Sequence, residues 1–110
     1  MKKELINLVR LQDFPLKVNG KKNCGVYGFR LDSKSRFIYI GATSDNIENR
    51  IKQHFSNYKL GKINENLKQL FDFCLQNNYN FSVEFLSGNP SDEKAFCELY
   101  KVSLNQLFYK

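Results

Sequence analysis

The chain has 110 residues, of which 42% are hydrophobic, and it carries a formal net charge of +6. This length suits a single domain, and the hydrophobic content excludes an intrinsically disordered chain. No apolar run approaches the roughly 20 residues needed to cross a membrane, so we expect neither a membrane span nor a signal peptide. A basic domain favours a polyanionic partner, most commonly nucleic acid, although a merely basic surface gives the same charge.

The three cysteines are Cys24, Cys74 and Cys97. Their number is odd, and their spacing is not that of metal ligands. We therefore expect reduced thiols in a cytoplasmic protein and no zinc site.

Residues 1–23 are expected to form an N-terminal extension that packs on a single domain of residues 24–110. Apolar residues are frequent between Glu4 and Asp13, which is compatible with a short helix. Phe14-Pro15 would end this helix, because the residue before proline avoids the helical region. The basic connector Leu16–Asn23 then holds either a short edge strand or a loop that faces nucleic acid.

Two segments rich in β-branched and aromatic residues, Cys24–Leu31 and Arg36–Ala42, flank the polar segment Asp32–Ser35. This pattern predicts a β-hairpin. Because side chains alternate between the two faces of a strand, Tyr27 and Tyr39 are expected on the same face of the hairpin.

A helix is predicted to begin after Asp45, which is followed three residues later by Glu48 in a variant of the capping box. Its apolar residues recur every four positions, as expected of a buried stripe. This stripe consists of Ile47, Ile51 and Phe55.

A second stripe on the same helix contains Arg50 and His54, which are also four residues apart. It borders the apolar stripe, so its side chains lie at the edge of the buried face. Two phenols, a guanidinium and an imidazole could therefore line one groove.

The remaining chain predicts a helix over Ile63–Gln76, a strand over Asn80–Leu86 and a last helix from Ser91 towards the chain end. The core-facing residues of the last helix are expected to be Phe96, Leu99, Val102 and Leu107. The predicted fold is therefore α/β of the α+β kind: a small three-stranded antiparallel sheet flanked by helices, in the order β-β-α-α-β-α, with an N-terminal helical extension.

These residues resemble the GIY-YIG nuclease superfamily from about Cys24 to Tyr109. Gly25-Val26-Tyr27 matches the first signature with Val in place of Ile, and Tyr39-Ile40-Gly41 matches the second signature unchanged. Arg50, His54 and Glu98 stand where members of the family keep an arginine, a histidine or tyrosine, and a metal-binding glutamate.

The resemblance implies a metal-dependent endonuclease that hydrolyses DNA phosphodiester bonds with a single Mg²⁺ or Mn²⁺ ion bound by Glu98. Tyr27 would act as the general base or orient the water. An ordinary phenol has a pKa of about 10, so neighbouring cations would have to lower the pKa of Tyr27, unless the phenol acts while protonated. Gly25 and Gly41 would serve the packing of the motif. The implied catalytic residues are Tyr27, Tyr39, Arg50, His54 and Glu98.

Four lysines are candidates for nucleic-acid contacts: Lys59, Lys62, Lys94 and Lys101. A solvated loop explains Lys59 and Lys62 equally well, and surface ion pairs with Glu98 explain the other two. Two other functions stay open. The domain could bind nucleic acid without cutting it, or it could be a basic interaction domain that matches the motifs by chance.

The chain departs from the family pattern after each motif. Ala42 follows Gly41 where some members place a lysine, and the family's late asparagine has no clear equivalent. Asn105 is the only asparagine after Glu98. It would lie about 10 Å further along a helix, at roughly 1.5 Å per residue, so we expect that it does not replace the family's asparagine.

Overall fold

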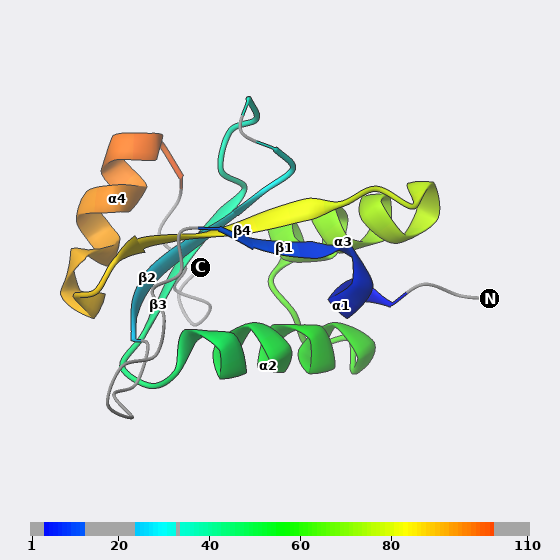
Figure 1. Cartoon of the computed structure of the whole chain (residues 1–110), viewed down its shortest axis with the longest axis horizontal. Coiled ribbons are helices and arrows are strands. Elements are labelled where there is room, and N and C mark those ends of the chain that lie inside the picture. The colour runs from blue at the N-terminus through cyan, green and yellow to red at the C-terminus, as the bar shows by residue number, and fades with distance from the viewer. Residues whose placement is uncertain (1–3, 13–23, 33, 103–110) are drawn as a thin grey trace.

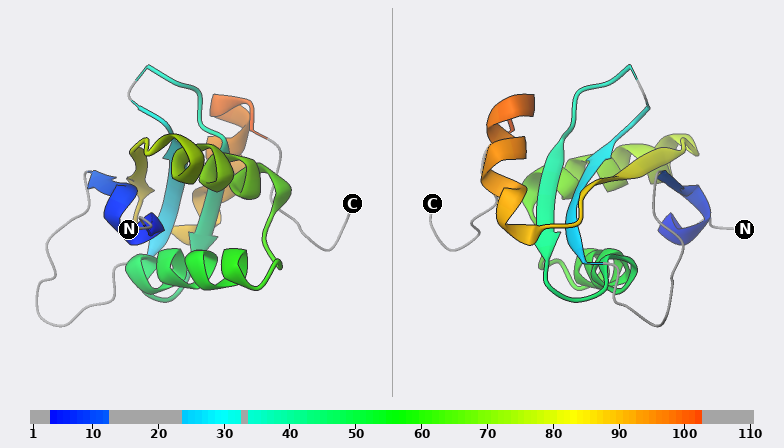
Figure 2. Two further views of the ribbon diagram at one scale, coloured as in Figure 1. Left: turned by 90° about the vertical axis from the view of Figure 1, so that its right-hand side faces the viewer. Right: turned by 60° about the vertical axis from the view of Figure 1, so that its left-hand side comes forward.

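The computed structural model describes residues 4–12, 24–32 and 34–102. It is an α+β structure in which helices cover both faces of one sheet (Figures 1 and 2). None of the described helices is long and apolar enough to cross a membrane. The elements are α1 (Leu5–Leu8), β1 (Val9–Gln12), β2 (Gly25–Arg30), β3 (Tyr39–Thr43), α2 (Ile47–Lys59), α3 (Glu65–Asn77), β4 (Phe81–Ser87), the 3₁₀ turn η1 (Pro90–Asp92) and α4 (Glu93–Tyr100).

The sheet has four strands in the order β1-β4-β2-β3, and the expected three-stranded antiparallel sheet is therefore wrong in detail. β2 pairs antiparallel with both β3 and β4, which accounts for the three expected strands. The additional strand, β1, lies parallel to β4, with Val9 opposite Phe81 and Leu11 opposite Val83. The sheet is mixed because the N-terminal segment contributes a strand to it.

The helix expected between Glu4 and Asp13 is much shorter than predicted. It ends at Leu8, and the backbone is already extended at Val9, where ψ is 140°. Leu5 and Leu8 are buried on one side of this single turn. Periodicity alone does not distinguish a helix from a strand in a short apolar run. Here the open edge of β4 offers backbone hydrogen bonds that favour the strand.

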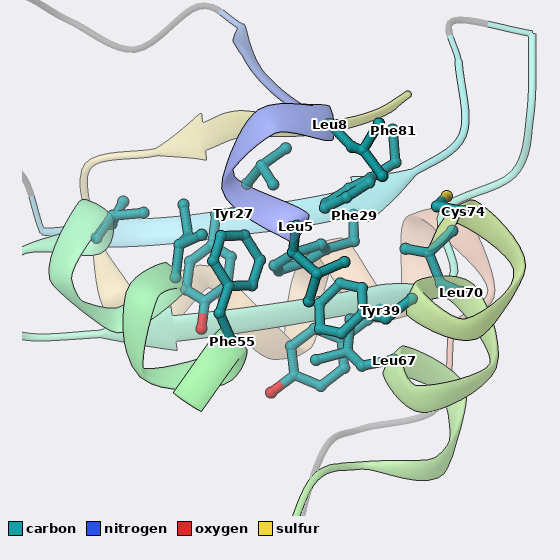
Figure 3. Packing of buried hydrophobic residues seen from close by; sticks show 14 residues of the cluster. Leu5, Leu8, Tyr27, Phe29, Tyr39, Phe55, Leu67, Leu70, Cys74 and Phe81 are labelled. Atoms are coloured by element: carbon teal, nitrogen blue, oxygen red, sulfur yellow. The ribbon is translucent and has the colours of Figure 1, made fainter. Parts of the chain in front are cut away.

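The hairpin of β2 and β3 is present, although β3 begins at Tyr39 and not at Arg36. Tyr39 lies opposite Phe29, and Gly41 lies opposite Tyr27. Tyr27 and Phe29 are two residues apart on β2, so Tyr27 and Tyr39 share one face of the sheet, as predicted. Both rings belong to the hydrophobic core that α1, α2 and α3 cover (Figure 3).

The helix that follows the hairpin has a different cap from the one predicted. The N-cap of α2 is Asn46, whose side-chain oxygen accepts a hydrogen bond from the Asn49 N–H at 3.1 Å. The predicted capping by Asp45 is therefore wrong by one residue, since Asn46 is equally able to cap. The predicted buried stripe of α2 is confirmed: Ile47, Ile51 and Phe55.

The last helix, α4, differs most from its prediction. It ends at Tyr100, because Lys101 adopts the left-handed conformation with φ of 58°. Cys97 is buried against the sheet, whereas Leu99, expected in the core, is 67% exposed. Phe96 and Val102 pack against the smaller core cluster, as predicted. Leu107 lies outside the described residues.

Candidate active site

The two motif tyrosines meet on the face of the sheet that α2 covers. Tyr27 of β2 is fully buried and Tyr39 of β3 is 5% exposed. Figure 3 shows both hydroxyl oxygens on the β3 side of the core cluster. A Cβ atom added to Gly41 would lie 2.8 Å from the Tyr27 hydroxyl and 2.9 Å from the Tyr39 ring. Gly41 is therefore required because the Tyr27 ring crosses the edge strand at a residue without a side chain.

The first motif glycine has a different role. Gly25 has φ of +140°, and a Cβ atom there would lie 1.9 Å from the Ser87 carbonyl oxygen. The backbones of β2 and β4 approach each other closely at this point, where the pairing shifts register between Val26 and Tyr27. Gly25 thus allows the start of β2 to lie against the end of β4.

His54 of α2 completes the buried part of the site. It is 4% exposed, and its Nε2 atom lies 2.9 Å from the Tyr27 hydroxyl oxygen. Its ring packs edge-on against Phe29 and Tyr39, with centroids 5.8 Å and 5.4 Å away. The imidazole is held by aromatic rings on one side and by one hydrogen bond on the other.

Arg50 lies one helical turn before His54 and is partly exposed. Its Nη1 donates a hydrogen bond of 2.6 Å to the Gln53 side-chain oxygen. The guanidinium also acts electrostatically on Tyr27, Tyr39 and His54: it lowers the pKa of all three groups. The structure thus brings together Tyr27, Tyr39, Arg50 and His54, with Arg50 as the member that solvent reaches.

Burial determines the protonation of these groups more than Arg50 does. Burial raises the pKa of Tyr27 far above its ordinary value, and the neighbouring Tyr39 adds to this, while Arg50 lowers it. Burial likewise raises the pKa of Tyr39 to about 12. Burial, followed by the charge of Arg50, lowers the pKa of His54 to about 3. At neutral pH both phenols are therefore protonated and the imidazole is neutral.

The acidic residues of α4 lie on different sides of the helix. Glu98 is exposed, and within the described residues no hydrogen bond or ion pair joins it to the four residues that meet in the site. Glu93 is half-buried, one helical turn before the buried Cys97. Sequence reasoning missed Glu93. The available signal was its spacing of four residues from Cys97, a residue type that is usually buried.

The four candidate lysines are all exposed. Lys59 forms an ion pair with Glu4 at 3.2 Å, and Lys62 lies in the turn after α2. Lys94 lies on the first turn of α4, and Lys101 is its left-handed C-cap. Their contact with nucleic acid stays a prediction. Asn105 lies outside the described residues.

A polar cavity of about 280 Å³ adjoins Arg50 at the start of α2. It leads from solvent to the guanidinium and presents hydroxyl and amide groups, which suit a sugar-phosphate backbone. Its lining residues are Thr43, Asp45, Asn46, Asn49, Arg50 and Gln53.

Comparison with known proteins found a family that matches this chain. Residues 23–106 match the family described as the GIY-YIG catalytic domain, so the match covers most of the chain. No curated protein and no solved structure matched the chain. Both signatures lie on the paired strands β2 and β3, and Arg50 and His54 lie on the helix that follows them. The chain therefore belongs to the GIY-YIG family.

Proposed function

We propose that this protein is an endonuclease that hydrolyses DNA phosphodiester bonds with a single divalent cation. The observation that carries the proposal is the convergence of Tyr27, Tyr39, Arg50 and His54, drawn from two strands and a helix. The family is one of nuclease domains, which supports a nuclease function in general. The choice of DNA, of one cation and of the residue roles is our own inference.

Arg50 would bind the scissile phosphate. Its planar guanidinium can donate two parallel hydrogen bonds to phosphate oxygens, and its charge favours the transition state, in which those oxygens carry more negative charge. Gln53 accepts from one guanidinium nitrogen and so restricts the side chain. Because Arg50 is partly exposed beside the polar cavity, a phosphate can reach it first.

Tyr27 and His54 would handle the proton of the attacking water. The Tyr27 hydroxyl would donate its O–H to the neutral His54 Nε2, 2.9 Å away, which leaves the Tyr27 oxygen able to accept a proton from water. When water attacks phosphorus and the bond to the leaving oxygen breaks, the water proton can pass to the Tyr27 oxygen while the Tyr27 proton passes to Nε2. The phosphate's negative charge favours the resulting imidazolium.

A divalent cation such as Mg²⁺ or Mn²⁺ would supply charge stabilisation for the phosphoryl oxygens and the leaving alkoxide. Among the described residues, no three His, Cys, Asp or Glu side chains lie close enough to form a metal site. Glu98, the expected metal ligand, is an exposed carboxylate on α4 and could hold a hard cation by itself, since Mg²⁺ commonly keeps several waters.

Nicking of supercoiled plasmid in the presence of Mg²⁺ or Mn²⁺, and its loss with a chelator, would test the proposal. Arg50→Ala should abolish nicking, and Arg10→Ala is the matched control because Arg10 is an exposed arginine on β1. Absence of nicking by the folded wild-type protein with either cation would refute the assignment as an endonuclease.

One observation favours a second candidate, a module that binds nucleic acid without cutting it. Tyr27 is fully buried, so a substrate can reach its hydroxyl only after neighbouring side chains move. Fluorescence anisotropy with labelled duplex DNA distinguishes the two functions. Salt-sensitive binding without nicking identifies the binding module, whereas nicking identifies the nuclease.

A further inference from the structure

An apolar groove lies between α3 and the end of the β2–β3 hairpin where β2 ends and β3 begins. Its α3 side is formed by residues at positions i, i+3, i+4 and i+7, which lie on one face of a helix. Its other side is formed by the residue after β2 and the residue before β3, and Figure 2 shows this end of the hairpin beside α3. The groove has a volume of about 220 Å³, and its lining residues are Leu31, Ile38, Asn66, Gln69, Leu70 and Phe73.

The inside of the groove is apolar, and one of its walls is an exposed aromatic ring. Leu70 is 3% exposed, and Leu31 and Ile38 are half-buried against the core. Phe73 is 44% exposed, and its ring centroid lies 5.8 Å from that of Tyr79, so a neighbouring ring supports it. An exposed aromatic ring beside apolar side chains is a surface on which a planar ring of a ligand can stack.

Two amide side chains form the polar rim of the groove. Gln69 and Asn66 are both exposed on α3. The Gln69 Nε2 atom donates a hydrogen bond to Glu65 at 3.4 Å, which leaves the Gln69 Oε1 atom as an acceptor. Asn66 bonds to Asn64 through its backbone N–H, and its side-chain amide forms no hydrogen bond with the described residues. A side-chain amide presents a donor beside an acceptor, which is the pattern that pairs with the edge of adenine.

The hairpin side of the groove carries positive charge. Lys34 and Arg36 lie between Leu31 and Ile38 and are exposed, and neither side chain forms an ion pair with a described residue. The carboxylate of Asp32 accepts hydrogen bonds within the same loop, from the Lys34 backbone N–H at 2.8 Å and from the Ser35 hydroxyl at 3.0 Å. A phosphate next to the groove would therefore meet two available cations.

We propose that this groove binds one unpaired base of a nucleic-acid strand, adenine most tightly, while Lys34 and Arg36 contact the phosphates on either side of it. The base would stack on Phe73, and the amides of Asn66 and Gln69 would bond to its edge. The inference rests on nucleic acid as the partner in the proposed function, although it does not require cleavage.

The position of the groove connects it to the cavity beside Arg50. Ile38 lines the groove, and Thr43, at the other end of β3, lines that cavity. The two residues are five positions apart, which is about 17 Å at about 3.4 Å per residue in a strand. A base in the groove would therefore lie several nucleotides from a phosphate bound by Arg50. The substrate class that fits both sites is a strand that is unpaired on one side of the cleaved bond.

Fluorescence anisotropy in the presence of a chelator tests base binding without cleavage. The probe is a short fluorescein-labelled strand of abasic units with one central adenine nucleotide, and the reference strand is entirely abasic. Wild-type protein should bind the adenine strand at least fivefold more tightly, as expected for the stacking of one base on an aromatic side chain. Phe73→Ala should remove this difference. Tyr100→Ala is the matched control, because it removes a ring that is 38% exposed on α4.

Further variants separate the base contacts from the phosphate contacts. Asn66→Ala and Gln69→Ala should each reduce the preference for adenine over unsubstituted purine, which lacks the exocyclic amine. Lys34→Ala should weaken the binding of the adenine strand and the abasic strand by the same factor, because a phosphate contact does not depend on the base. Phe73→Leu keeps an apolar side chain against α3 and should still lose the preference for adenine, with an unchanged circular dichroism spectrum.

The outcomes separate this inference from the proposed function. Equal affinity of the wild-type protein for the two strands would overturn the inference, and so would a preference for adenine that persists in Phe73→Ala. A dimer in sedimentation experiments that Phe73→Ala abolishes would also overturn it, because a second copy of the chain would then occupy the groove. Nicking of plasmid without a preference for adenine refutes this inference alone. A preference for adenine without nicking supports it and refutes the assignment as an endonuclease.

Discussion

Acidification should destabilise the protein through His54. The sequence contains one histidine. Histidine is the side-chain type whose ordinary pKa, about 6.5, falls between pH 5 and pH 7. In the folded state the imidazole is buried against aromatic rings and bonded to the Tyr27 hydroxyl. Burial, with a smaller contribution from the charge of Arg50, lowers its pKa from 6.5 to about 3.

The sign of the effect follows from proton linkage. Between pH 6.5 and about pH 3 the unfolded chain binds a proton at His54 that the folded chain does not bind. Protonation therefore favours the unfolded state, and the free energy of unfolding falls as the pH falls through this range. Glu93 acts in the opposite direction, because burial raises the pKa of its carboxyl in the folded state.

The expected size of the His54 effect is about 2 kcal/mol between pH 7 and pH 5. It comes from about 1.4 kcal/mol for each pH unit below the unfolded pKa of 6.5. Since a domain of this size has a free energy of unfolding of about 5–15 kcal/mol, the loss is a substantial part of the total.

Urea unfolding followed by circular dichroism at pH 7 and pH 5 would measure it. His54→Gln keeps a hydrogen-bonding side chain opposite Tyr27 but does not titrate, so its unfolding free energy should lack this 2 kcal/mol dependence. Comparing the two proteins cancels the contribution of Glu93, which both retain. Equal pH dependence in the wild type and the variant would refute the reasoning that His54 is buried and neutral.

Three other predictions concern the site and its partner. Arg50→Lys should reduce nicking by at least tenfold, because a point charge cannot donate two parallel hydrogen bonds, and normal nicking would contradict this. The same substitution should change the free energy of unfolding by no more than about 0.5 kcal/mol, because Arg50 is partly exposed. Gly41→Ala should lower the unfolding free energy by about 1–3 kcal/mol in urea titrations, since its Cβ would lie 2.8 Å from the Tyr27 hydroxyl, and an unchanged value would show that the ring moves freely. DNA affinity should fall on a log-log salt plot with a slope of about −0.9 per phosphate contacted, and an affinity insensitive to salt would indicate a different partner.

The central part of the site could be predicted because short-range periodicity determines it. Alternation along two paired strands places Tyr27 and Tyr39 on one face, and a spacing of four residues aligns Arg50 with His54. These relations depend on backbone geometry within single elements and across one hairpin. The structure places all four residues together, although Tyr27 is more deeply buried than a groove-lining residue would be.

The parts that could not be predicted depend on contacts between distant segments. The strand from Val9 forms because β4 presents an open edge, and that edge lies about 70 residues away in sequence. Likewise, the rotation of α4 depends on which side chain the sheet accepts. It buries Cys97 and leaves Leu99 exposed, a choice that apolar spacing alone does not make. Glu93 was missed because its position follows from this rotation.

The burial of Tyr27 and His54 is compatible with a role in proton transfer. A phenol and an imidazole lose hydration in the core, which is costly unless each finds a hydrogen-bonding partner. Tyr27 and His54 satisfy each other, and none of the described buried side-chain polar atoms is left without a partner. The pair can therefore belong to the hydrophobic core and still share a proton between the Tyr27 hydroxyl oxygen and the His54 Nε2 atom. In the proposed function Arg50, at the solvent-exposed end of the same cluster, would make the first contact with a phosphate. Substrate binding and proton transfer would then come from residues one turn apart on the same side of α2.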